Sequence, residues 1–105
     1  MENYEVREFV RKINRRKFLG KTEFIDNINN FFLENDYNIS KQYLYCDNDH
    51  ISDIIIINCQ KNDISINMSV NNFINKIYSI YVDINKLKII SISLDIIETK
   101  KSIIY

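Results

Sequence analysis

The sequence predicts an α+β domain in which an N-terminal helical hairpin packs on one face of a five-stranded antiparallel β-sheet. Over residues 3–35, apolar side chains recur at three- and four-residue spacing, as in amphipathic helices. Over residues 37–97, Ile-rich segments alternate apolar and polar side chains, as in strands. Only two to four polar residues separate most of these segments, and connections this short join antiparallel neighbours. The predicted order is two helices, then a meander, then a short tail at residues 98–105.

The first predicted helix spans Asn3 to Leu19 and carries an apolar stripe beside a row of arginines. Gly20 follows at the position of a left-handed residue that ends a helix, and Thr22 is the expected cap of the next one. The second helix, Glu23 to Glu34, has phenylalanine and isoleucine on one face. Its several asparagines are poor helix formers, so its stability must come from packing on the sheet.

The first strand is expected at Tyr37 to Cys46, followed by a polar turn at residues 47–50. The second, residues 51–59, contains four consecutive isoleucines, Ile54 to Ile57, which place apolar side chains on both faces. We expect a turn at residues 60–63 and a third strand at 64–70, where the alternation is clearest.

The last two strands, residues 74–84 and 87–97, are expected to form a hairpin. We favour a register with an odd-length loop, or a bulge at Ile89–Ile90, that brings one apolar face together. This face comprises Tyr78, Ile80, Val82, Ile90, Ile92 and Leu94. Ile77, Tyr81 and Ile89 then remain on the side away from the helices. With an isoleucine pair from the second strand and Tyr43 or Tyr45, they predict an apolar patch that binds a partner.

A chain of 105 residues forms a single domain, and its apolar fraction of 46% excludes wholesale disorder. The longest apolar run, Ile54 to Ile57, is far too short to cross a membrane, and the charged N-terminus does not have the apolar core of a signal peptide. We therefore expect a cytoplasmic protein. Cys46 and Cys59 would lie more than about 20 Å apart in the predicted hairpin, so we expect reduced thiols.

Charge is unevenly distributed although the net charge is zero. Residues 1–21 hold seven basic and three acidic side chains, whereas residues 22–63 hold two basic and eight acidic ones. Acidic loops on a rigid scaffold would hold a cationic protein, and a basic helix would bind nucleic acid. The candidate acidic residues are Glu34, Asp36, Asp47, Asp49 and Asp53. The candidate nucleic-acid-binding residues are Arg7, Arg11, Lys12, Arg15 and Arg16.

Neither catalytic nor cofactor signatures occur in the sequence. The group around His50 offers several carboxylates, but a calcium loop needs a central glycine and a terminal glutamate that are missing here. Cys46 and His50 supply only half of a zinc site. No cysteine or serine stands in a glycine-containing elbow, and Gly20 alone cannot form a phosphate loop. We expect no metal, no cofactor and no enzymatic activity.

In size, composition and absence of motifs, the chain is similar to small immunity proteins of bacterial toxin systems and to small phage-encoded inhibitors. The expected function is that of a non-enzymatic domain that binds a protein and inhibits it stoichiometrically. The expected target is a cationic toxin or enzyme, for example a nuclease. The alternative is a nucleic-acid-binding regulator that uses the basic first helix. A third possibility is that the apolar patch forms a homodimer.

Overall fold

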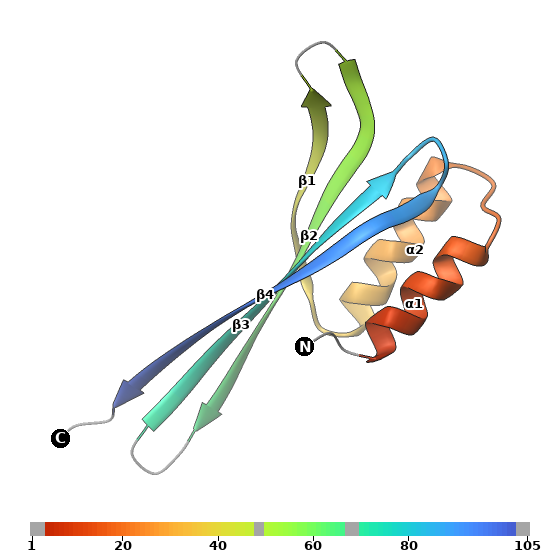
Figure 1. The fold of residues 1–105 in the computed structure, drawn as a ribbon. Helices are drawn as coiled ribbons and strands as arrows, with labels where there is room; N and C mark the ends of the chain where they lie inside the picture. The colour runs from red at the N-terminus through yellow and green to blue at the C-terminus, as the bar shows by residue number, and fades with distance from the viewer. Residues whose placement is uncertain (1–3, 48–49, 67–69, 103–105) are drawn as a thin grey trace.

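The computed structural model describes residues 4–47, 50–66 and 70–102, with side chains described at 4–40, 54–66 and 70–100. It contains two helices followed by an antiparallel sheet, which confirms the α+β class (Figure 1). The described residues form four strands, in the spatial order β1-β2-β3-β4. The elements are α1 (Tyr4–Arg15), α2 (Lys21–Glu34), β1 (Asn38–Asp47), β2 (His50–Ile66), β3 (Val70–Asp83) and β4 (Lys88–Ser102).

The expected turn at residues 60–63 is instead the middle of β2, which accounts for the difference from five strands. Gln60 pairs with Ile77 and Asp63 pairs with Ile74, so the ladder with β3 runs without interruption through these polar residues. Residues 71–73, which connect the predicted strands 64–70 and 74–84, also belong to a strand, β3. Polar side chains suit both a turn and a solvent-exposed strand, and here pairing along the ladder satisfies the backbone.

The helical hairpin is built differently from the prediction around Gly20. α1 ends at Arg15, and Gly20 is extended, with φ −177° and ψ −179°, so it is not a left-handed terminator. Its carbonyl accepts a hydrogen bond from the Phe24 N–H at 3.2 Å, which opens α2. The Glu23 carboxylate, rather than Thr22, supports this end by accepting from the Leu19 N–H at 2.8 Å.

The core lies between the helices and one face of the sheet. Phe24, Ile28 and Phe32 of α2 are fully buried, as are Ile57, Tyr78 and Ile80 of the sheet. Phe32 is the centre of an aromatic cluster. Its ring meets those of Phe9, Phe31 and Tyr37 edge-on, with centroids 5.2–6.2 Å apart. The apolar residues of the helices and of the sheet thus pack together around these aromatic rings.

The β3–β4 hairpin closes with a pair and then shifts its register through a bulge. Asp83 pairs with Lys88 across residues 84–87, and the Asp83 carboxylate accepts the Asn85 and Lys86 N–H groups at 2.9 Å each. Val82 then pairs with Ile89 and Tyr81 with Ser91, which leaves Ile90 as the extra residue of a bulge. The bulge restores Ile92 and Leu94 to the core side.

Ile89 was predicted on the side away from the helices, and that placement is wrong. It is 5% exposed and belongs to the core, whereas Ile90 is 54% exposed. The closing pair between Asp83 and Lys88 is the physical reason, because it sets Ile89 beside buried Val82.

The sheet extends well beyond the helices. Figure 1 shows the far ends of β2, β3 and β4 projecting as a three-stranded ribbon away from α1 and α2, and the principal extents are 56 × 32 × 20 Å. We call this ribbon, residues 60–66, 70–77 and 95–102, the distal arm. Its first residues, Lys61 and Lys76, still border the helices beside Val6 and Phe31. Further along the arm, the ribbon in Figure 1 extends away from both helices.

Candidate protein-binding face

Strand alternation defines a second face of the sheet, which we call the reverse face. Tyr78, Ile80 and Val82 point into the core, so their neighbours in β3 point to the opposite side. Ile56 of β2 lies beside Tyr81, and Asp95 of β4 lies beside Ile77. Following this alternation along β2, β3 and β4 gives the apolar members of the reverse face, which are Ile54, Ile56, Ile64, Ile66, Phe73, Ile77, Tyr81 and Ile97.

Exposure of these residues increases toward the distal arm. Near the helices, Ile56 and Tyr81 are half-buried. In the arm, Ile64 is 62% exposed, Ile66 75% and Ile97 54%. The strand register places Ile64 next to Phe73, and a shallow groove of about 350 Å³ runs past both residues and Ile97. The apolar residues therefore form a stripe along three strands, which the polar row of Asn58, Ser79 and Ser93 crosses. The most exposed part of the stripe lies in the arm.

The reverse face carries little charge. Among the residues with described side chains, its charged members are Asp83, Lys88 and Asp95. Lys88 lies opposite Asp83 at the closed end of the hairpin and donates to the Asn14 carbonyl, so Asp95 is the charged residue within the apolar stripe. The remaining polar positions are amides and hydroxyls, such as Asn58, whose side-chain oxygen accepts a hydrogen bond from Ser79 at 3.0 Å. The opposite face of the arm differs in kind, because it bears the charged residues Lys61, Asp63, Lys76, Glu98 and Lys100.

The acidic residues singled out from the sequence do not gather at one place. Glu34 ends α2, and Asp36 follows it with φ 67°; both are exposed. Asp47 lies at the other end of the ten-residue β1, a separation of roughly 30 Å at the usual rise per strand residue. Asp49 lies outside the described residues, as do the side chains of Asp47 and Asp53. Within the described part of the chain, Glu34 and Asp36 are thus far from Asp47.

The basic residues of the first helix also divide. Arg16 turns toward α2, where its guanidinium bonds Glu23 at 3.2 Å and Asn27 at 2.9 Å and lies 4.9 Å from the centre of the Phe18 ring. Arg11 pairs with Glu8 at 2.9 Å. Lys12 and Arg15 are exposed. The five candidate nucleic-acid-binding residues therefore do not form a single basic surface.

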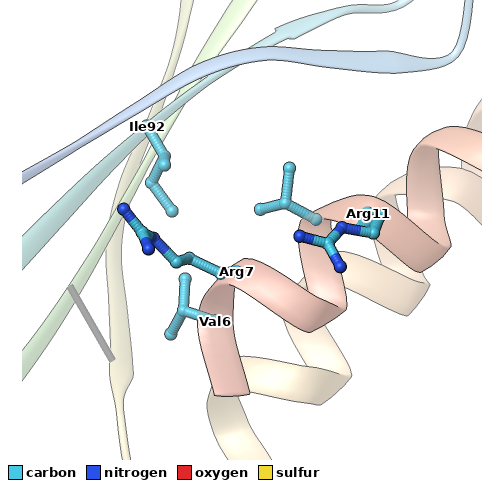
Figure 2. A pocket seen from close by; sticks show the side chains of 5 residues that line it. Val6, Arg7, Arg11 and Ile92 are labelled. Carbon is cyan, nitrogen blue, oxygen red and sulfur yellow. The ribbon is translucent and has the colours of Figure 1, made fainter. Parts of the chain in front are cut away.

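A hollow of about 300 Å³ separates α1 from β4 (Figure 2). Val6, Val10 and Ile92 supply its apolar lining, and Arg7 and Arg11 supply its charge. Figure 2 shows the Arg7 side chain reaching from α1 toward Ile92, with Arg11 one turn further along the helix. This hollow lies on the helix side of the sheet, so it is separate from the reverse face.

Of the apolar residues predicted to bind a partner, Ile77 and Tyr81 do lie on the reverse face. The Tyr45 side chain is outside the described residues. Sequence reasoning missed Phe73 and the outward position of Ile64, because two supposed turns separated them from Ile77. It also missed Ile97, the last residue of a predicted strand, which lies beside Asn75 on this face. The signal that could have found them is the alternation that continues through Asn62, Ile64 and Ile66.

Two titratable groups in the core have raised pKa values. Burial raises the pKa of the Cys59 thiol to about 12, and this cysteine is free. Burial, followed by the nearby Tyr78 and Asp63, raises the pKa of Tyr37 to about 12. Because both groups stay neutral at physiological pH and lie beneath the helices, they stabilise the fold and do not form a reactive centre.

Among the residues that the structure describes, no group of three or more His, Cys, Asp or Glu side chains is arranged to hold a metal ion. Within the same residues, neither helix has the length and apolar character needed to span a membrane. Comparison with protein-family models, with curated proteins and with solved structures finds no match for this chain. The physical character of its surfaces is therefore the basis for a functional conclusion.

Proposed function

We propose that this chain is a non-enzymatic protein-binding domain that docks on a cationic protein through its reverse face and inhibits that protein stoichiometrically. An immunity protein that neutralises a bacterial toxin, for example a nuclease, is the model for this activity. A cytoplasmic location, expected from the sequence, is part of the proposal. The observation that carries it is the apolar stripe that ends in exposed Ile64, Ile66 and Ile97.

Apolar residues on this scale are unusual on a free surface. Single exposed isoleucines are common, but an extended row of them, bordered by amides and hydroxyls, is typical of an interaction site. A three-stranded face of about 14 residues per strand covers roughly 600 Å² at ordinary strand spacing and rise. Stable complexes bury about 600–1,000 Å² on each partner. The reverse face is therefore large enough to form an interface without help from the helices.

The charge within the stripe favours a cationic partner over a neutral one. Asp95 is exposed and lies beside Ile77, so it is at the centre of the stripe. A partner that places a lysine or arginine opposite Asp95 gains a favourable contact, and an acidic partner would be repelled there. Such a face would block the part of the partner's surface that it covers, without catalysing a reaction. A stoichiometric inhibitor acts in this way.

Two adjacent isoleucines provide a matched pair of variants. Ile97 is 54% exposed and lies on the reverse face, while Ile96 is 49% exposed and lies on the other face of the arm, beside Lys76. Ile97→Lys should abolish binding, because it loses the burial of an isoleucine, about 1.5–3 kcal/mol, and buries a charge. Ile96→Lys should leave binding within about threefold, since a change outside the interface leaves its contacts intact.

The experiment compares the wild type with both variants. Each is used to capture partners from the cells that produce the chain, and the complex is then rebuilt from purified components. A protein that is retained by wild type and Ile96→Lys but lost with Ile97→Lys, and whose activity falls to zero at a one-to-one ratio, is the expected result. Equal loss with both variants would exclude the reverse face.

Sedimentation of the chain alone adds a second check. If wild type sediments as a dimer and Ile97→Lys as a monomer, the reverse face joins two copies of the chain and the inhibitor proposal fails. A monomer that captures no protein also contradicts it.

A further inference from the structure

The outer edge of β4 carries a second feature, independent of the reverse face. β4 is the last strand in the sheet order, and among the described residues it pairs with β3 alone. The edge of a sheet offers unpaired N–H and C=O groups to an additional strand. We propose that this edge, together with the hollow beside α1, binds an extended acidic peptide segment of a partner protein as a fifth strand.

Asn14 shows how the edge accepts a neighbour. Its side-chain amide donates to the Ile89 carbonyl at 3.0 Å, and its side-chain oxygen accepts the Ile89 N–H at 2.8 Å. One amide thus takes both outward backbone groups of Ile89, as an adjacent strand would. The Lys88 ammonium also donates to the Asn14 carbonyl, so α1 is fastened to this end of β4. At Ile89, Asn14 therefore occupies the position of a further strand. An added strand can pair only with the residues of β4 that follow Ile89.

The bonds to Asn14 also establish which backbone groups are available further along. In an antiparallel strand, successive residues direct their backbone groups alternately to one neighbour and the other. Because the backbone groups of Ile89 point outward, those of Lys88 point to Asp83 in β3. Tyr81 lies two residues before Asp83, so its backbone groups also point to β4, where it pairs with Ser91. Ser91 therefore faces β3 despite the bulge. The outward residues that follow are Ile92, Leu94 and Ile96.

The hollow beside this edge supplies the side-chain contacts. Ile92, the first outward residue after the bulge, lines it together with Val6 and Val10 of α1. A strand added along β4 would place alternate side chains against these apolar residues. Its other neighbours are the guanidinium groups of Arg7 and Arg11 (Figure 2).

Charge identifies the occupant. The charged residues that line the hollow are the two arginines, and Arg11 also pairs with Glu8 beside it. An added strand that carries glutamate or aspartate is favoured there, and a basic strand is repelled. A strand between an edge and a helix gains main-chain hydrogen bonds from one side and side-chain contacts from the other, a recurring mode of peptide recognition. The ligand is therefore an extended segment with alternating acidic and apolar residues.

The test uses a fluorescein-labelled peptide of alternating glutamate and valine, with the corresponding lysine and valine peptide as the control. The acidic peptide should bind and raise fluorescence polarisation, and the basic one should not. Arg11→Glu should weaken binding by at least about tenfold, whereas Lys12→Glu, a charge reversal of the same size outside the hollow, should change it by less than about threefold. Ile97→Lys should bind the peptide as the wild type does, which separates this site from the reverse face.

Amide hydrogen exchange measures the main-chain pairing directly. In the free protein, the N–H groups of Ile92, Leu94 and Ile96 should exchange quickly, while those of Ser91, Ser93 and Asp95 should be protected by β3. The acidic peptide should protect the first set and leave the second unchanged. A peptide methylated on its backbone nitrogens should lose both protection and affinity.

Three results would overturn this inference. Protection of the outward amides that rises with protein concentration, without peptide, would assign the edge to a second copy of the chain. Arg11-dependent binding of a single-stranded oligonucleotide, without binding of the acidic peptide, would assign the arginines to nucleic acid. Peptide binding that leaves the exchange of Ile92, Leu94 and Ile96 unchanged would exclude an added strand.

Discussion

Substitution of Asn14 by alanine tests whether the contact between α1 and the edge of β4 holds the helical layer in place. Asn14 makes two hydrogen bonds to Ile89, at 2.8 and 3.0 Å, across 75 residues of sequence. Hydrogen bonds between neutral groups contribute about 0.5–1.5 kcal/mol each, so the pair contributes roughly 1–3 kcal/mol. The higher helix propensity of alanine stabilises the folded state by up to about 0.7 kcal/mol, which offsets part of this loss. The expected net loss in the free energy of unfolding is about 1–2 kcal/mol.

Asn30→Ala is the matched control. Asn30 is an exposed residue of α2, so its replacement brings the same gain in helix propensity without touching the sheet. The control should be neutral or slightly stabilised, by at most about 0.7 kcal/mol. Urea unfolding, followed by circular dichroism, gives the free energy of unfolding of both variants. In thermal unfolding, Tm should fall by about 4–8 °C for each kcal/mol lost.

Exchange of the Ile89 amide identifies the cause of the loss. In the wild type this N–H should be protected by Asn14, and in Asn14→Ala it should exchange rapidly. The reasoning is refuted if Asn14→Ala is as stable as Asn30→Ala, or if the Ile89 amide stays protected without the asparagine. In either case, the bonds that fasten α1 to β4 would be unimportant for stability.

Two further predictions concern the core. Phe32→Ala should lower the free energy of unfolding by about 3–5 kcal/mol, because it empties the centre of the aromatic cluster. Leu33→Ala, at a position 52% exposed, should lower it by under about 1 kcal/mol. Similar losses for the two variants in urea unfolding would contradict the placement of α2. Cys59, with its pKa raised from 9.0 to about 12, should be inert to thiol reagents in a folded Cys46→Ser background. Its neutral thiol stabilises the fold below about pH 9, and that contribution should disappear as the pH rises toward 12. Cys59→Ala should therefore lose less stability over this interval, and identical pH profiles would disprove the burial effect.

The sequence predicted the architecture wherever periodicity and burial act together. The Phe24, Ile28 and Phe32 stripe predicted α2, and the alternation of Tyr78, Ile80 and Val82 predicted the core side of β3; all six are buried. The bulge at Ile89–Ile90 was also anticipated, because the apolar residues on its two sides are out of phase. The identity of the bulged residue was not, since it depends on the Asp83–Lys88 closing pair.

The candidate surfaces were only partly predictable, for two physical reasons. The polar stretch at residues 60–63 has the composition of a turn, and only its pairing with β3 shows that it is a strand and that the arm is continuous. The hollow beside β4 depends on contacts between residues far apart in sequence, such as Asn14 and Ile89. Neither local propensity nor charge counts contain that information.

The docking role of the reverse face is tested most directly by NMR of the chain labelled at its isoleucine δ1-methyl groups, during titration with the captured partner. The methyl signals of Ile64, Ile77 and Ile97 should shift or broaden, and those of Ile74 and Ile96, on the other face of the distal arm, should stay in place. Shifts confined to Ile74 and Ile96, with Ile64 and Ile97 unmoved, would contradict docking through the reverse face.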